Sequence, residues 1–205
     1  METYTRKGYS ITLFGKWDEH YIETCKAGST YFYQSHGTSI KTLLSHKPWR
    51  LPREADGGIS RRWVNSLAVY ADDCQMIAIL WNEFFTVIHA GRRGLKYWII
   101  DHAVKKLCRQ GELLVDIDVV VGPCIKGDAY VVGDVFPQNF PPSYFFVKDG
   151  NNHFRIDQYW YDCLVKTWVL PEHITVHPDC TYQDNEKRHS RRKNGKNPHN
   201  RMVVA

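Results

Sequence analysis

Short apolar runs separated by polar breaks dominate the middle of the chain. Residues 67–70 and 76–80 are apolar, and the polar break between them ends in Cys74; residues 84–88 are rich in aromatic and β-branched side chains. Runs of this length with polar boundaries are typical of buried strands. The pattern predicts three strands, with Cys74 following the first run and His89 ending the third.

The hydrophobic period changes after Gly94. Apolar side chains then recur at helical spacing until Gly111 ends the pattern. These side chains are Leu95, Trp98, Ile99, Ala103 and Leu107. The pattern predicts one amphipathic helix.

Residues 115–121 alternate and then run apolar, which predicts another strand that ends at Gly122. The stretch after this strand contains Pro137, Pro141 and Pro142, and these prolines predict a loop.

A second helix is predicted to begin at Asp157, whose side chain is a plausible N-cap. Trp160, Leu164 and Trp168 would face inward, and Pro171 would close the helix.

A last short strand is predicted at residues 173–177. Since strands are mixed with two helices, we expect an α/β fold of α+β-like character, in which mixed sheets form a layered domain with helices packed outside.

Composition supports one ordered globular domain over residues 1–205. A chain with 43% hydrophobic and 14% aromatic residues can bury a sizeable core. No run reaches the length of a membrane span and no signal-peptide pattern follows the polar start, so we expect a cytoplasmic protein. A reducing compartment would keep the six cysteines as thiols, and the absence of a Cys-x-x-Cys pair argues against ribbon-type zinc sites.

The net charge of +5 is concentrated in a basic C-terminal segment, residues 187–201, which holds seven of the 27 Lys and Arg residues and no acid. Such a segment can bind nucleic acid electrostatically. A solvated terminal segment is the commoner explanation, and we do not predict nucleic-acid binding.

His36, Cys74 and His89 have side chains of the types that bind zinc. A catalytic zinc ion typically takes three protein ligands and keeps a fourth position for water, whose pKa falls to about 7. Paired strands could bring Cys74 and His89 to one rim, because each follows an apolar run. The trio thus suggests an open zinc site, although 10 histidines and 6 cysteines make a chance trio common.

Gly91 and Gly94 enclose Arg92 and Arg93 between a predicted strand and a predicted helix. Backbone N–H groups at a helix start attract anions, and guanidinium groups bind phosphate in bidentate fashion. The alternative is an ordinary glycine turn with solvated arginines.

Nine short sequence words, taken in order, resemble the laccase-domain family, whose members are also called polyphenol oxidase-like, purine nucleoside phosphorylase or peptidoglycan-editing-factor proteins. The words are Ser-His-Gly-Thr (35–38), Glu-Ala-Asp-Gly (54–57), Ala-Asp-Asp-Cys (71–74), His-Ala-Gly-Arg-Arg-Gly-Leu (89–95), Val-Gly-Pro-Cys-Ile (121–125), Tyr-Val-Val-Gly (130–133), Cys-Thr-Tyr (180–182), Ser-Arg-Arg (190–192) and Arg-Met (201–202). The resemblance covers about residues 30–205, and the word at 89–95 is its most specific part.

The resemblance implies a single-domain layered α/β fold with zinc held by His36, Cys74 and His89. It further implies phosphorolysis of adenosine, inosine, guanosine or methylthioadenosine, and deamination of adenosine. Bacterial members are also described as amidases that remove misplaced L-serine from a peptidoglycan precursor, and the laccase name implies copper and phenol oxidation.

Within these chemistries, Asp72, Asp73 or another nearby carboxylate would transfer protons. Arg93 matches an arginine of the family and is expected to hold phosphate, with Arg191 or Arg192 as alternatives. The expected partners are thus a nucleoside and phosphate.

The chain also departs from the family pattern. Arg92 stands where the family usually has tryptophan, and Ala71 where it usually has threonine. The region before His36, residues 1–30, is shorter than in most members, which bears on substrate recognition more than on metal binding.

Three rival interpretations of the trio remain. A copper site would use two His and one Cys with Met76 as an axial ligand, but a laccase needs further His-x-His words that the chain lacks. A cysteine hydrolase would use Cys74 as nucleophile and His89 as base. A non-catalytic nucleic-acid-binding module would use zinc structurally, and such a site usually has four ligands.

A cytidine-deaminase site requires Pro-Cys-x-x-Cys, and Pro123-Cys124 lacks the second cysteine. The oligomeric state is not predictable from the sequence.

Overall fold

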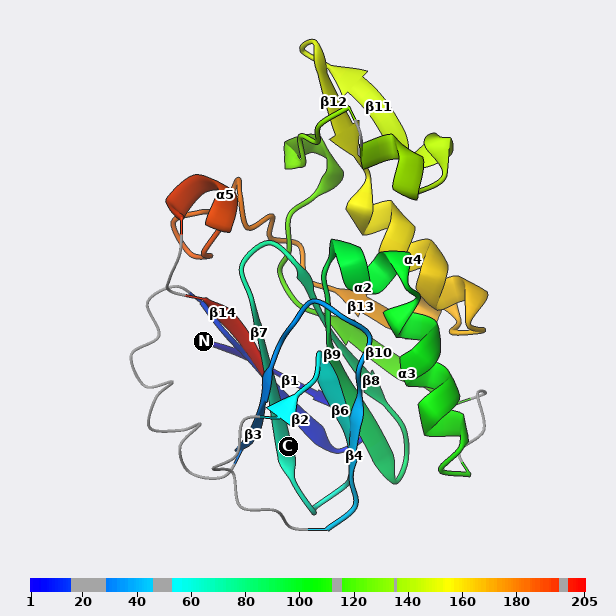
Figure 1. The fold of residues 1–205 in the computed structure, drawn as a ribbon. Coiled ribbons are helices and arrows are strands. Elements are labelled where there is room, and N and C mark those ends of the chain that lie inside the picture. Colours follow the sequence, from blue (N-terminus) through cyan, green and yellow to red (C-terminus); the bar gives the residue numbers. More distant parts are fainter. Residues whose placement is uncertain (16–28, 46–52, 112–115, 135, 196–198) are drawn as a thin grey trace.

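The computed structural model describes residues 1–15, 29–45, 53–111, 116–134, 136–195 and 199–205. Within them, two six-stranded mixed sheets pack face to face, and helices cover the outer face of the second sheet (Figure 1). The predicted layered α/β fold, with helices outside mixed sheets, is confirmed.

The first sheet has the spatial order β1 (Glu2–Arg6), β2 (Tyr9–Phe14), β14 (Asn200–Val204), β7 (Ser66–Ala71), β3 (Ser29–Tyr33) and β5 (Arg53–Glu54). The second sheet has the order β13 (Ile174–Val176), β10 (Asp118–Val121), β8 (Gln75–Leu80), β9 (Phe84–Ala90), β6 (Gly57–Arg61) and β4 (Lys41–Leu43). A separate hairpin, β11 (Phe145–Lys148) and β12 (Asn151–Phe154), projects beyond the sheets at one end (Figure 1).

The strand β8 is a continuous apolar run because both of its faces are buried. Met76, Ala78 and Leu80 pack between the two sheets, whereas Ile77 and Ile79 pack beneath the helices. A central strand that is covered on both faces needs no polar positions. The three strands predicted between residues 67 and 88 are confirmed as β7, β8 and β9.

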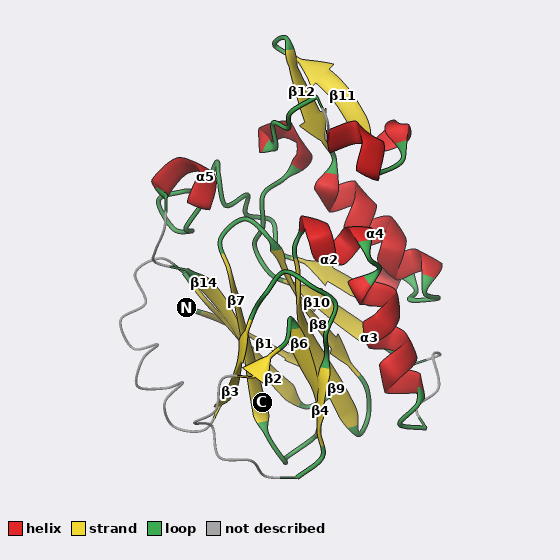
Figure 2. Ribbon diagram, in the orientation of Figure 1, coloured by secondary structure: helices red, strands yellow, loops and turns green. Residues whose placement is uncertain are grey.

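The helices are α2 (Arg92–Lys96), α3 (Ile99–Cys108), α4 (Ile156–Lys166) and α5 (Arg191–Asn194). Short 3₁₀ segments occupy Gly127–Ala129, Phe136–Asn139, Pro142–Tyr144 and Pro171–His173. The second and third lie in the stretch where Pro137, Pro141 and Pro142 predicted a loop. The helix α3 packs on the second sheet and α4 packs against α3 (Figure 2); the two helices bury Val104, Leu107, Trp160 and Leu164.

Two predictions about where the helices end are wrong. The helix predicted from Leu95 is broken at Trp98, which has a left-handed φ of 61° and is 65% exposed. Trp168 lies beyond the end of α4 with a φ of 71° and is 79% exposed instead of facing inward. A residue with positive φ turns the chain out of the helical path. The helical spacing of apolar residues therefore continues in the sequence although the helix itself is interrupted.

The N-cap of α4 also differs from the prediction. It is Arg155, and Asp157 lies in the first helical turn, where its carboxylate accepts a hydrogen bond from the Gly127 N–H at 3.0 Å. The strand predicted from residue 115 is observed as β10, and residues 112–115 lie outside the described residues.

The C-terminal segment is solvated only in part: Lys187 and residues 191–195 are exposed, as its charge predicts, but the rest of its described residues are anchored to the fold. Arg188, His189 and Ser190 are buried, and β14 pairs with both β2 and β7. The strand predicted at 173–177 is therefore not the last one; it is β13, parallel to β10 at the edge of the second sheet. The strand β14 was not predicted, because its alternation of buried and partly buried residues begins inside the basic segment.

We expect the substitution Met202→Ala to lower the free energy of unfolding by about 2–5 kcal/mol, because the Met202 side chain is 0% exposed between the sheets. Chemical denaturation checks this. Lys187→Ala, at an exposed position of the same segment, should change stability by less than about 0.5 kcal/mol. Equal effects of the two substitutions would contradict an inter-sheet position for β14.

Candidate metal and substrate site

Antiparallel pairing of β8 and β9 brings Cys74 and His89 to one edge of the second sheet. Met76 lies opposite His89 and Gln75 opposite Ala90, so Cys74 precedes β8 at the level where β9 ends. His36 reaches the same place from the loop after β3, with a left-handed φ of 60°. One ligand atom from each of the three residues lies within 4.8 Å of the others. The structure therefore brings the predicted trio together.

The Asp56 carboxylate, which is 0% exposed, holds two members of this trio in place. It accepts hydrogen bonds from the His36 N–H at 2.8 Å and the Gly37 N–H at 2.6 Å, and it lies 3.0 Å from His89 Nδ1. A carboxylate that engages Nδ1 fixes the tautomer with its lone pair on Nε2, as metal-binding histidines require. The sequence alone did not reveal this role of Asp56, although the residue lies in the word at 54–57.

The trio is electrostatically coupled. Burial raises the pKa of the Cys74 thiol, but attraction to His89 and hydrogen bonding to both imidazoles outweigh it and lower this pKa to about 6. Burial lowers the pKa of His89, but the Cys74 thiolate and Asp56 raise it to about 9. Contacts with His89 and the Gly37 N–H likewise hold the Asp56 pKa below its ordinary value against the effect of burial. Thiolate, the form that binds metals, is thus favoured at neutral pH.

Gly91 leaves open the space that the trio surrounds. A Cβ at this position would lie 3.0 Å from Cys74 Sγ, 3.1 Å from His36 Cδ2 and 3.4 Å from His89 Cε1. One thiolate and two imidazoles suit zinc or copper, so the donor set and the open space both fit a metal ion. Met76, the possible axial ligand for copper, is buried between the sheets.

Two cavities are lined by members of the trio: His36 and Cys74 line both, and His89 lines only the smaller one. The larger, of about 430 Å³, is lined by four arginines, Arg92, Arg93, Arg191 and Arg192, together with Tyr130. The smaller, of about 280 Å³, is lined by aromatic side chains, Tyr33, Tyr70 and His199. Residues that line both are His36, Asp73, Cys74 and Arg191. A cationic compartment and an aromatic compartment therefore adjoin His36 and Cys74.

The predicted strand–Gly-Arg-Arg-Gly–helix unit is observed, since α2 begins at Arg92 directly after β9 and Gly91. The helix is only five residues long. The positive charge of this cavity therefore lies on the guanidinium groups, and not on a helix dipole.

Both predicted carboxylates lie beside the trio, but each is engaged. Asp73 accepts hydrogen bonds from the Thr181 hydroxyl at 2.8 Å and the Arg192 N–H at 3.1 Å, which anchors the C-terminal segment to the site. Asp72 contacts two imidazoles of that segment, and they hold its pKa below the ordinary value against the effect of burial. Asp72 lines only the smaller cavity, whereas Asp73 lines both.

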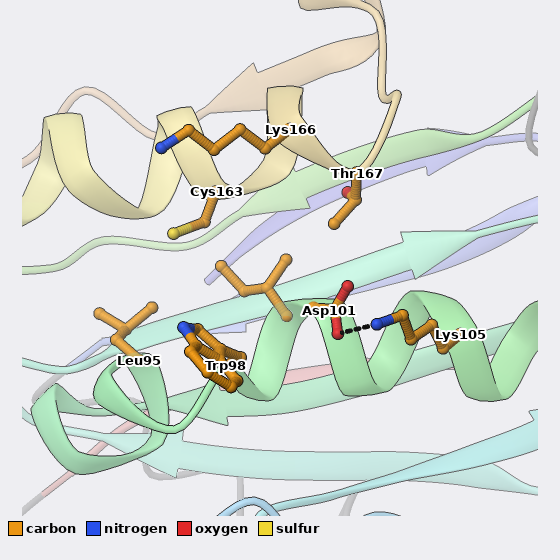
Figure 3. A pocket seen from close by; sticks show the side chains of 8 residues that line it. Leu95, Trp98, Asp101, Lys105, Cys163, Lys166 and Thr167 are labelled. Carbon is orange, nitrogen blue, oxygen red and sulfur yellow. Dashed lines mark ion pairs between the residues drawn. The ribbon is translucent and has the colours of Figure 1, made fainter.

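A third cavity, of about 320 Å³, lies between α3 and α4, away from the trio (Figure 3). Trp98 and Leu95 line one side and Cys163 and Lys166 the other. Its lining contains no member of the trio.

Among the described residues, no helix is long and apolar enough to cross a membrane.

Comparison with known proteins gives a family. The sequence profile described as multi-copper polyphenol oxidoreductase laccase matches residues 19–204. This match confirms the resemblance that the short sequence words indicated.

Curated relatives match over shorter segments. A purine nucleoside phosphorylase of Aquifex aeolicus is 38% identical over 101 residues, which cover 49% of this chain and 47% of the relative. A purine nucleoside phosphorylase of Synechocystis is 36% identical over 80 residues (38% of this chain, 30% of the relative), and an adenosine deaminase from an unknown prokaryotic organism is 32% identical over 85 residues (40% and 32%). The matches therefore span less than half the length of each relative.

Solved structures share the fold. The hypothetical protein YfiH of Bacillus licheniformis aligns with a TM-score of 0.76 at 21% identity, over 86% of this chain and 73% of that one. YlmD of Geobacillus stearothermophilus gives a TM-score of 0.76 at 21% identity (86% and 72%), and NMB0706 of Neisseria meningitidis gives 0.75 at 19% identity (91% and 78%).

Proposed function

The chain belongs to the multi-copper polyphenol oxidoreductase laccase family, and we propose that it is a zinc-dependent purine nucleoside enzyme. Its reactions are phosphorolysis of adenosine, inosine, guanosine or methylthioadenosine, and deamination of adenosine. The observation that carries this proposal is the pair of adjoining cavities, one lined by four arginines and the other by aromatic rings.

Phosphorolysis needs phosphate and a nucleoside on opposite sides of one sugar carbon. Guanidinium groups bind phosphate oxygens through charge-assisted, often bidentate, hydrogen bonds, so phosphate belongs in the arginine-lined cavity. Aromatic side chains stack against purine rings, so the base belongs beside Tyr33 and Tyr70. The sugar then lies next to the residues that both cavities share.

The metal site supports the same function. His36, Cys74 and His89 would hold zinc, and Asp56 would keep His89 in the required tautomer. Bound zinc acts as a Lewis acid and lowers the pKa of water to about 7, which is the chemistry that deamination requires. Two of the relatives are named purine nucleoside phosphorylase and one adenosine deaminase, which supports both activities.

The test is incubation of the zinc-loaded protein with adenosine, inosine and methylthioadenosine, with and without phosphate, followed by mass spectrometry. We expect free base and ribose phosphate only when phosphate is present, and inosine from adenosine without it. Unchanged nucleosides would refute the proposal.

Metal analysis distinguishes zinc from copper. Protein purified without added metal should contain zinc at one equivalent or less and no stoichiometric copper. Stoichiometric copper together with phenol oxidation would support the laccase chemistry instead.

A thiolate nucleophile is the second candidate, because Cys74 has a lowered pKa and is hydrogen-bonded to His89. Chelation separates the two mechanisms. Turnover that is lost on chelation and restored by zinc supports the metal enzyme, whereas turnover retained without metal supports the thiolate.

We expect Arg93→Ala to raise the KM for phosphate about 10- to 100-fold, because a hydrogen bond between charged groups contributes about 1.5–3 kcal/mol. Steady-state kinetics at varied phosphate measure this. Deamination of adenosine consumes no phosphate and should keep its rate. Arg109→Ala, which removes an arginine outside the cavity lining, should leave both reactions unchanged; a normal phosphate KM for Arg93→Ala would exclude Arg93 as the phosphate ligand.

A further inference from the structure

A second cluster of titratable side chains lies beside the trio. Asp72 Oδ1 is 2.9 Å from His189 Nδ1 and 2.6 Å from His199 Nδ1. The three residues come from the turn after β7, the segment before α5 and the position just before β14. The Asn200 side chain ties this cluster together, because it donates to the backbone carbonyls of Asp72 and His189 at 3.1 and 2.7 Å.

His189 is the fixed member of the cluster. Its side chain is 0% exposed, and its Nε2 is buried with no hydrogen-bond partner among the described residues. With the proton on Nδ1, the ring donates to Asp72 and only a lone pair is left unpaired. A metal on Nδ1, or a second proton, would instead leave a buried N–H without an acceptor, which costs about 1–3 kcal/mol. The Nδ1 of His189 therefore serves as a hydrogen-bond donor to Asp72, and the cluster is not built for a metal.

His199 differs from His189 in its access to the site. Its side chain is 30% exposed and lines the aromatic cavity together with Cys74 and His89. The ring packs against Tyr70, with centroids 5.1 Å apart. Since Asp72 engages Nδ1, the nitrogen that remains able to exchange a proton is Nε2. A carboxylate that orients an imidazole in this way is the arrangement of acid–base histidines in enzymes.

We propose that His199 is the proton-transfer residue of nucleoside phosphorolysis, and that Asp72 and His189 position its ring. The proposal rests on the proposed nucleoside function. Asp72 was expected from the sequence to transfer protons; in this proposal it orients a histidine and does not itself transfer them.

The proton balance of phosphorolysis requires such a residue. The bond between C1′ and the purine nitrogen breaks with its electron pair going to the purine, and an oxygen of HPO4²⁻ forms the new bond to C1′. The purine must gain a proton and the phosphate must lose one. Protonated His199 donates to the departing purine. Phosphate lies in the arginine-lined cavity, which His199 does not line, so its proton passes to solvent, and the neutral imidazole regains a proton from solvent.

Several charged or titratable groups surround His199. They are Tyr33, His36, Tyr70, Asp72, Asp73, Cys74, His89, His189 and Arg191. Because so many groups would contribute to a pH profile, the sharper test replaces His199 itself.

The experiment compares His199→Asn with His199→Ala in the zinc-loaded protein. Asparagine keeps an N–H donor where Nδ1 contacts Asp72 but offers no nitrogen that can transfer a proton. We expect both variants to lose about 10²- to 10⁴-fold in kcat for phosphorolysis, with the KM for phosphate and the zinc content unchanged. Added imidazole should restore part of the rate of the alanine variant, to a degree that varies with the pKa of the imidazole derivative.

A purely structural role predicts the opposite pattern. His199→Asn would then keep wild-type kcat, and imidazole would not help the alanine variant; either result overturns the inference. Loss of zinc from both variants would also overturn it. A wild-type protein that turns over no nucleoside refutes the proposed function and this inference with it, whereas an active wild type with an active asparagine variant refutes the inference alone.

Discussion

Replacing Cys74 by serine should abolish nucleoside turnover and leave the fold mostly intact. Serine is close in size to cysteine, but its hydroxyl does not ionise near neutral pH, so the negatively charged ligand is lost. The trio would retain two imidazoles, one fewer protein ligand than catalytic zinc sites normally use. We expect kcat to fall at least about 10³-fold, which corresponds to about 4 kcal/mol of transition-state stabilisation.

Metal content, circular dichroism and turnover should be measured on the same preparation. The matched control is Cys108→Ser, which removes a partly buried thiol of α3 that packs with the core beneath the helices. That variant should keep its zinc and its activity. A fully active Cys74→Ser protein would remove Cys74 from the site.

The second large effect is expected at Asp56. Asparagine has the same shape, but only one of its two terminal side-chain atoms accepts hydrogen bonds. It therefore cannot replace both Oδ1, which contacts the His36 N–H and His89, and Oδ2, which accepts from the Gly37 N–H. Loss of a partner that orients a metal-binding histidine typically weakens metal affinity about 10- to 100-fold. We expect Asp56→Asn to show this loss in competition with a chelator, and a free energy of unfolding lower by at least about 1–3 kcal/mol because a buried donor is left unpaired.

Glu54→Gln is the matched control for Asp56→Asn. Glu54 is exposed and lies two residues earlier in the chain, so removing its charge should change neither zinc affinity nor stability. Wild-type zinc affinity in Asp56→Asn would show that His89 is oriented without the carboxylate.

The pattern of apolar residues correctly predicts the elements whose structure depends on neighbours in the sequence. The strands β7, β8 and β9 are recognisable as apolar runs, because strands that are buried on both faces consist mostly of apolar residues. Their pairing places Cys74 beside His89, which is why those two ligand candidates follow from the sequence. Helix ends were less predictable, since Trp98 and Trp168 continue an apolar rhythm after the backbone has turned away.

By itself, the sequence determined the layered α/β fold, the family and the residue types of the trio, because these depend on apolar periodicity and on short words. Only the tertiary structure decided which carboxylate serves which histidine. Asp56 reaches His89 across 33 residues, and Asp72 reaches His199 across 127. It also decided that the basic C-terminal segment is anchored in the site through Asp73 and β14. Hydrogen bonds between distant segments produce no periodic pattern in a sequence, because tertiary packing, and not sequence spacing, determines which residues meet.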